Sequence, residues 1–171
     1  VFGHLTYKHL RLTGLVSWRD KTVPTAAYDT TFNDPRLTTG DGRALLDLQY
    51  DRPFGQTAVS LRTYVNRYTY EGVYPYGDDG RFFDEAVAVV WGGEARATRE
   101  VPGRQTLTVG GEFRHNVRQD QRGRYEGEPD FDIRESSRVV GLYVHDEVEL
   151  TTQWRLVAGA RFDDYAGFSR L

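Results

Sequence analysis

The chain has 171 residues, 25 acidic and 22 basic side chains, a formal net charge of −3 and no cysteine. This charge argues against a dedicated nucleic-acid-binding protein, which normally shows a basic face, and the lack of cysteine excludes a disulfide framework, a thiolate metal site and a cysteine nucleophile. No run of about 18 apolar residues is present, so the sequence contains no membrane-spanning helix.

Alternation of apolar and polar residues with a period of two dominates the sequence. It is clearest where Leu107, Val109 and Phe113 share one side of a strand while Thr108 and Glu112 share the other. No helical stripe competes with this pattern. The alternation and its boundaries predict eight strands, at residues 2–8, 10–20, 43–52, 56–71, 85–100, 104–118, 137–150 and 154–165.

The connections between these strands alternate in length. Short turns are expected at Lys8-His9, around Pro53-Phe54-Gly55, at Pro102-Gly103 and at Thr151-Thr152, and long polar stretches at 21–42, 72–84 and 119–136. Short turns on one side and long loops on the other are typical of bacterial membrane barrels. Most strands are also long enough to cross hydrocarbon, which takes about ten tilted residues.

The predicted fold class is therefore all-β, an antiparallel transmembrane β-barrel segment. The alternative is a soluble β-sandwich, because its strands alternate in the same way. Strand length and loop asymmetry favour the barrel, since soluble strands usually stop near five or six residues.

The loop count predicts that residues 1–171 are one part of a larger barrel. Four short turns and three long loops place both chain ends on the long-loop side, and residues 167–171 read as the start of another loop. Strands one and eight would otherwise be open edges, which lipid does not tolerate.

Two neighbouring segments resemble a known family. Residues 141–150 (GLYVHDEVEL) and 154–165 (WRLVAGARFDDY) resemble the "LYVQDE…LT…L…AGLRYDDY" hairpin of TonB-dependent receptors. His145 stands where that family usually has Gln, Ala160 where Leu is frequent, and Phe162 where Tyr is common. Three further segments look like receptor loops of this family, at residues 23–26, 32–35 and 68–76.

The resemblance implies a bacterial outer-membrane location and a barrel of about 22 strands with a plugged lumen. It also implies uptake of a scarce ligand, such as a ferric siderophore or a vitamin, energised by the TonB complex through a plug domain. Neither a plug nor a TonB-box segment is recognisable in residues 1–171. The implied partners are outer-membrane lipid, the TonB complex and a small molecule or metal chelate.

The best candidates for ligand contact lie between residues 70 and 83. They are the aromatic and basic side chains Tyr74, Tyr76, Arg81, Phe82 and Phe83. Aromatic rings beside an arginine suit an anionic or aromatic chelate. The same residues equally fit an interfacial aromatic girdle or a self-packed loop.

Other constellations are weaker. Carboxylates at alternate positions can ligate calcium, and the weak candidates are Asp78, Asp79, Asp84, Asp130 and Asp132. The spacing of an EF-hand loop is absent, and no catalytic motif occurs, so neither a cofactor nor an enzyme is expected. Charged residues on the polar faces are expected to line the lumen: Arg11, Arg43, Asp47, Glu112, Arg114, Arg155 and Arg161.

Three function classes follow from these observations. The first is a barrel segment of an active outer-membrane receptor. The second is a passive porin-like channel or a small adhesion barrel, which needs no plug. The third is a soluble ligand-binding β-domain, which would fold as a monomer in plain buffer.

Overall fold

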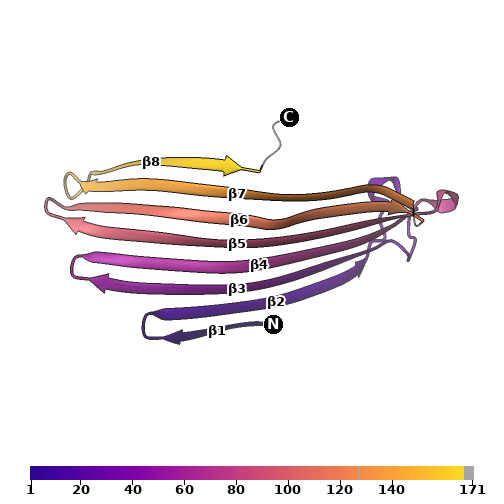
Figure 1. Cartoon of the computed structure of the whole chain (residues 1–171), viewed down its shortest axis with the longest axis horizontal. Coiled ribbons are helices and arrows are strands. Elements are labelled where there is room, and N and C mark those ends of the chain that lie inside the picture. The colour runs from indigo at the N-terminus through magenta and orange to yellow at the C-terminus, as the bar shows by residue number, and fades with distance from the viewer. Residues whose placement is uncertain (127, 168–171) are drawn as a thin grey trace.

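The computed structural model describes residues 1–126 and 128–167, which form one open antiparallel sheet. Its strands follow chain order from β1 to β8, as Figure 1 shows. Their bounds are β1 Phe2–Tyr7, β2 Leu10–Thr22, β3 Thr38–Phe54, β4 Thr57–Pro75, β5 Arg81–Val101, β6 Gln105–Tyr125, β7 Glu128–Glu149 and β8 Arg155–Ala166. No helix in these residues is long and apolar enough to cross a bilayer. The predicted number of strands and the all-β fold class are confirmed.

The strand register gathers the apolar residues on one side of the sheet. Leu12 lies opposite Leu48 across β2 and β3, and Val65 lies opposite Trp91 across β4 and β5. Directly opposed residues of an antiparallel pair point to the same side. We call the side that carries this apolar stripe the outer side and the opposite one the inner side.

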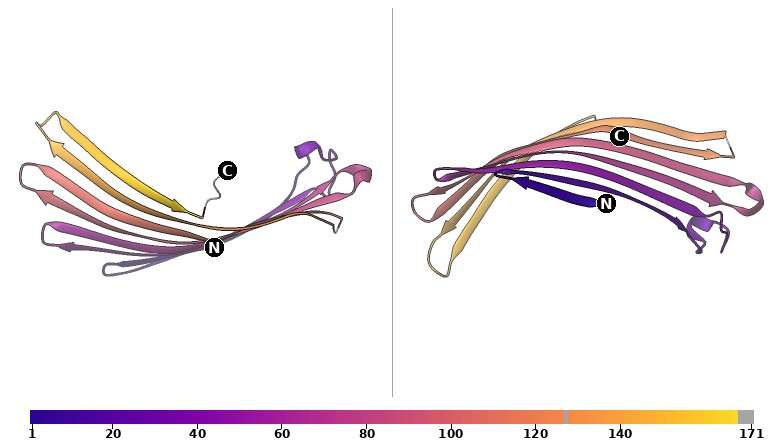
Figure 2. Two further views of the ribbon diagram at one scale, coloured as in Figure 1. Left: turned by 45° about the horizontal axis from the view of Figure 1, so that its top comes forward. Right: turned by 90° about the horizontal axis from the view of Figure 1, so that it is seen from below.

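Within residues 1–126 and 128–167, nothing packs against the outer side. Leu142, Phe162 and Trp18 are 60%, 67% and 71% exposed, and the sheet is a single curved layer (Figure 2). A β-sandwich would bury this stripe between two sheets about 10 Å apart. The described residues contain no second sheet, so the sandwich alternative is wrong.

The short turns lie at one end of the sheet, as expected. Lys8, Gly55 and Gly103 have positive φ angles of 53°, 60° and 99°, which tight hairpin turns require. In the turn between β7 and β8, the Thr151 hydroxyl accepts a hydrogen bond of 3.0 Å from the backbone N–H of Trp154. All four turns are on the left in Figure 1.

The strands at the other end are longer than the sequence predicted. β4, β5, β6 and β7 continue through most of the stretches expected as loops at 72–84 and 119–136, and β3 begins at Thr38. The sequence did not reveal this continuation, because the apolar stripe ends before the strands do and polar side chains follow it. Residue 127 and residues 168–171, part of the loop expected at the chain end, lie outside the described residues.

Charged residues expected in the lumen all have inner-side positions in the register. Several of them form ion pairs: Asp47 pairs with Arg62 at 2.6 Å and Arg161 with Glu112 at 2.9 Å between strands, and Arg161 also pairs with Asp163 at 2.8 Å within β8. In each pair the acidic and the basic side chain neutralise each other on the inner side of the sheet. The inner side is therefore polar but not strongly charged.

Three residues that break the apolar alternation are explained by the register. Leu15, Leu45 and Val90 all have inner-side positions, and Leu15 lies directly opposite Leu45. Asn66 connects the row, because it pairs with Leu45 on one side and with Val90 on the other. The exceptions therefore form a short apolar row across the otherwise polar side.

Inner-side glycines make room for aromatic rings from neighbouring strands. A Cβ atom at Gly110 would come within 3.0 Å of the Tyr143 ring, and one at Gly92 would do the same with Tyr64. The Tyr143 hydroxyl donates a hydrogen bond to Glu94 across two strand boundaries. Glycine is needed here for close approach rather than for an unusual backbone angle.

The two sides of the sheet should respond differently to charge. We expect Leu46→Arg to lower the free energy of unfolding by about 2–4 kcal/mol, because it places a cation in hydrocarbon. Leu45→Arg changes the neighbouring residue, which lies at the same depth on the inner side, and it should lower the free energy of unfolding much less. Urea unfolding of the full-length protein in lipid vesicles measures both, and an equal loss would contradict the assignment of the sides.

The glycine positions give a second test. We expect Gly110→Ala to destabilise the protein by roughly 1–2 kcal/mol, because the new methyl group displaces Tyr143 and breaks its hydrogen bond to Glu94. Gly14→Ala is the control, since a Cβ atom there meets nothing within 4 Å. The same unfolding measurement applies. If Gly110→Ala left the free energy of unfolding unchanged, Gly110 would not be needed to make room for the Tyr143 ring.

Candidate ligand-binding site

The strongest candidate site lies on the inner side, where β4 and β5 extend beyond the apolar stripe. An open concavity of about 540 Å³ occurs there, within the volume range of small-molecule sites. We call it the aromatic pocket, and its lining residues are Tyr28, Tyr70, Tyr74, Tyr76, Phe82 and Asp84.

The rings of the pocket pack against one another in a continuous cluster. Tyr74 contacts Tyr28 edge-on at 5.8 Å between ring centroids and lies 6.3 Å from Phe82. Phe82 in turn lies 4.8 Å from Tyr125 and 6.3 Å from Phe131. Five segments of the chain thus hold the rings in place, namely the loop before β3 and strands β4, β5, β6 and β7 at this end of the sheet.

Small residues permit this clustering. Gly72 lies between Tyr70 and Tyr74 on the inner side, and a Cβ atom there would collide with both phenol groups. The two hydroxyls instead share a hydrogen bond. Gly123 likewise leaves room for two rings, because a Cβ atom there would collide with Phe82 and Phe131.

The loop of residues 23–37 brings Tyr28 to the pocket. Leu37 is fully buried at its end, and the Thr31 N–H donates a 3.0 Å hydrogen bond to the Pro75 carbonyl at the end of β4. Tyr28 has φ 57° and ψ 38°, a left-handed conformation that costs a bulky residue about 1 kcal/mol or more. The surrounding loop contacts maintain it, and Tyr28 as a whole remains 78% exposed.

Three phenol groups of the pocket, those of Tyr70, Tyr74 and Tyr76, have raised pKa values. Burial raises the pKa of Tyr70, Tyr74 and Tyr76 above its ordinary value of 10.0. The Asp84 carboxylate adds to the rise in pKa at Tyr70 and Tyr74. The rings therefore offer uncharged stacking surface and hydroxyl groups at physiological pH.

The structure brings together only part of the predicted ligand site. Tyr74, Tyr76 and Phe82 line the pocket, whereas Arg81 and Phe83 lie on the outer side, because β5 alternates. Arg81 forms an ion pair with Glu126 at 3.1 Å and lies over Phe83 at 5.5 Å. Arg81 therefore lies beside Phe83 on the outer side, and no arginine is among the described residues that line the pocket.

Sequence reasoning missed four residues of this cluster, Tyr28, Tyr70, Tyr125 and Phe131. Tyr70 shares the strand parity of Tyr74 and could have been found from that spacing, whereas Tyr28 and Tyr125 reach the site from distant segments. No local pattern connects such segments. They meet only because the strand register aligns the ends of β4, β5 and β6.

The calcium candidates do not converge. Asp84 has an inner-side position, whereas Asp132 lies on the outer side and pairs with Arg134 at 2.9 Å. Asp78 and Asp79 belong to the turn between β4 and β5, and Asp130 belongs to β7. Among the described residues, no group of three or more potential metal ligands is arranged to hold an ion.

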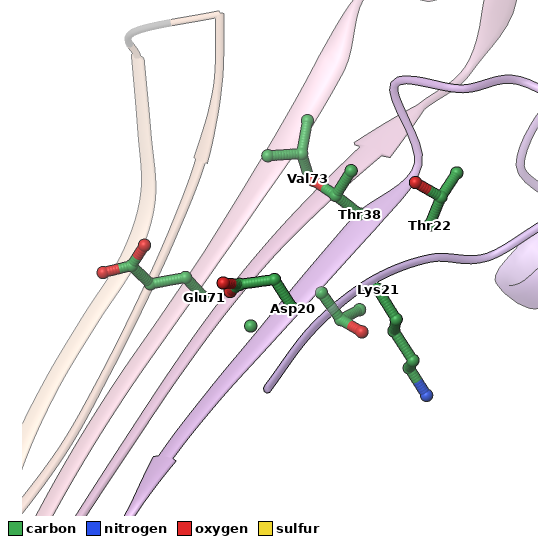
Figure 3. Close-up of a pocket in the computed structure, with 8 residues that line it drawn as sticks. Asp20, Lys21, Thr22, Thr38, Glu71 and Val73 are labelled. Carbon is green, nitrogen blue, oxygen red and sulfur yellow. The ribbon is translucent and has the colours of Figure 1, made fainter. Parts of the chain in front are cut away.

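A second concavity, of about 430 Å³, lies between the ends of β2, β3 and β4. Asp20 and Glu71 contribute to it from outer-side positions, on either side of Gly40. Figure 3 shows Lys21 extending away from Asp20, as alternation along β2 requires. This groove is separate from the aromatic pocket and has no ring in its lining.

The model of one protein family, described as "TonB dependent receptor-like, beta-barrel", matches residues 2–170. Searches of curated proteins and of solved structures found no match. The matched region includes every strand and the aromatic pocket. The exposed apolar stripe on the outer side agrees with this match, and the chain belongs to the TonB-dependent receptor-like β-barrel family, a family of the bacterial outer membrane.

Proposed function

We propose that this chain is part of the barrel of an active-transport receptor, which takes up a scarce ligand such as a ferric siderophore or a vitamin with energy from the TonB complex. In this proposal the sheet is one section of a larger barrel that surrounds a plug domain. The aromatic pocket is the site where the ligand first binds from outside the cell.

The observation that supports this proposal is the position of the pocket. It opens on the inner side, beyond the apolar stripe and at the end opposite the tight turns. In bacterial barrels the tight turns face the periplasm, so this end faces the exterior. A ligand arriving from outside would meet these rings before it reached the membrane-spanning part of the lumen.

The composition of the pocket favours ligand capture over passive flow. A passive channel needs a polar, hydrated mouth through which solutes pass without binding strongly. Here Tyr76 and Phe82 are partly exposed, so these two rings present stacking surface with little conformational entropy to lose.

Uptake by living cells tests the proposal. Cells that express the full-length protein are given siderophores loaded with radioactive iron, and separately radiolabelled cobalamin. We expect at least one label to accumulate, and its uptake to stop when the TonB gene is deleted. Equal uptake without TonB would show a passive barrel instead.

The same assay tests the pocket. Phe82→Ala removes a central ring and should lower the rate of uptake at limiting ligand by about five- to tenfold, as loss of an aromatic anchor commonly does. Phe83→Ala is the matched control, because Phe83 is the next residue and lies on the outer side. Equal losses in the two variants would argue against binding in the pocket.

A further inference from the structure

The ends of β4 to β7 keep their arginines on one side of the sheet. In residues 67–75, 81–89, 118–125 and 128–135, every arginine has an outer-side position: Arg67, Arg81, Arg118, Arg122, Arg124 and Arg134. Inner-side positions carry the acids Asp84, Glu128 and Glu135. Within these described segments, no arginine or lysine shares that side.

A β-bulge maintains this placement of the arginines. The register of β5 and β6 shifts by one residue after Asn116, where Val89 pairs with Arg118 and Val90 with Asn116. Without that shift in register, Arg118 would lie opposite Ala88 and have an inner-side position. The bulge instead puts Gln119 on the inner side, opposite Ala88.

Asp84 is the one charged residue that lines the aromatic pocket, among the residues described there. Its carboxylate accepts a single hydrogen bond from a side chain, a long one of 3.3 Å from Gln121. Among residues 1–126 and 128–167, no basic nitrogen lies within ion-pair distance of it. The next residue, Glu85, differs in this respect, since it pairs with Arg124 at 3.7 Å on the outer side.

The nearby cations are already paired elsewhere. Arg36 forms an ion pair with Asp34 at 2.6 Å in the loop before β3, and Arg81 is bound to Glu126. These pairs leave the carboxylate of Asp84 uncompensated. An anion entering the pocket would be repelled by Asp84 and would find no cation there to receive it.

We propose that the aromatic pocket binds an organic cation, or the cationic end of a larger ligand, which stacks on the tyrosine rings and pairs with Asp84. Neutral aromatic rings attract ammonium groups through their negatively charged faces, and a nearby carboxylate strengthens the attraction. This inference rests on the proposed function for the role of the pocket, and it names the charge of the ligand.

Calorimetric titration of the full-length protein in non-ionic detergent tests the charge preference. The two probes are phenyltrimethylammonium and benzenesulfonate, which carry the same ring and opposite charges. We expect the cation to bind and the anion to show no measurable heat. Tighter binding of benzenesulfonate, or no binding of phenyltrimethylammonium, would overturn the proposal.

Two adjacent variants localise the effect. Asp84→Asn keeps the size of the side chain and removes its charge, and it should weaken the binding of phenyltrimethylammonium by roughly tenfold. Glu85→Gln makes the same change on the outer side and should leave that affinity unchanged. Unchanged binding in Asp84→Asn would also overturn the proposal.

These outcomes are distinguishable from failure of the proposed function. A receptor whose uptake depends on TonB but whose pocket binds benzenesulfonate overturns the cation preference alone. A pocket that binds phenyltrimethylammonium in a protein whose uptake does not depend on TonB overturns the transport proposal alone.

Discussion

Every feature of this sheet depends on one constraint, which is that a strand in hydrocarbon has no water to hydrogen-bond its backbone. Continuous pairing from β1 to β8 satisfies the N–H and C=O groups of the interior strands. It also fixes the register, and the register decides which side each residue faces. The apolar stripe, the inner ion pairs and the aromatic pocket are all consequences of that alternation.

The same alternation explains how polar chemistry and lipid contact coexist in one layer. Ion pairs such as Asp47 with Arg62 occupy the inner side at the same depth at which Leu46 and Leu48 occupy the outer side. Beyond the apolar stripe, side chains still alternate between the two sides, but the residue types on each side change. Arginines then replace the outer apolar residues, and aromatic rings with Asp84 replace the inner ion pairs.

Much of the fold could be predicted from the sequence. Alternation located all eight strands and the tight turns, because lipid contact imposes a strict period of two on the spanning residues. It could not locate the true ends of β4 to β7, since beyond the membrane both sides are wet and the pattern loses contrast. The site was predicted in part for the same reason. Tyr74 and Phe82 were found. Arg81 was wrongly placed on the same surface, because the start of β5 at this residue was not recognised and its outer-side position could not be inferred.

The central claim is that hydrocarbon covers the outer side, and nitroxide labels placed singly along β3 in lipid vesicles test it most directly. At residues 44, 46, 48 and 50 the label should respond to oxygen dissolved in the membrane, and at 45, 47 and 49 to a water-soluble paramagnetic complex. This alternation is what the account predicts. Labels at even positions that neither reagent reaches would mean that protein covers the stripe, and the membrane assignment would be contradicted.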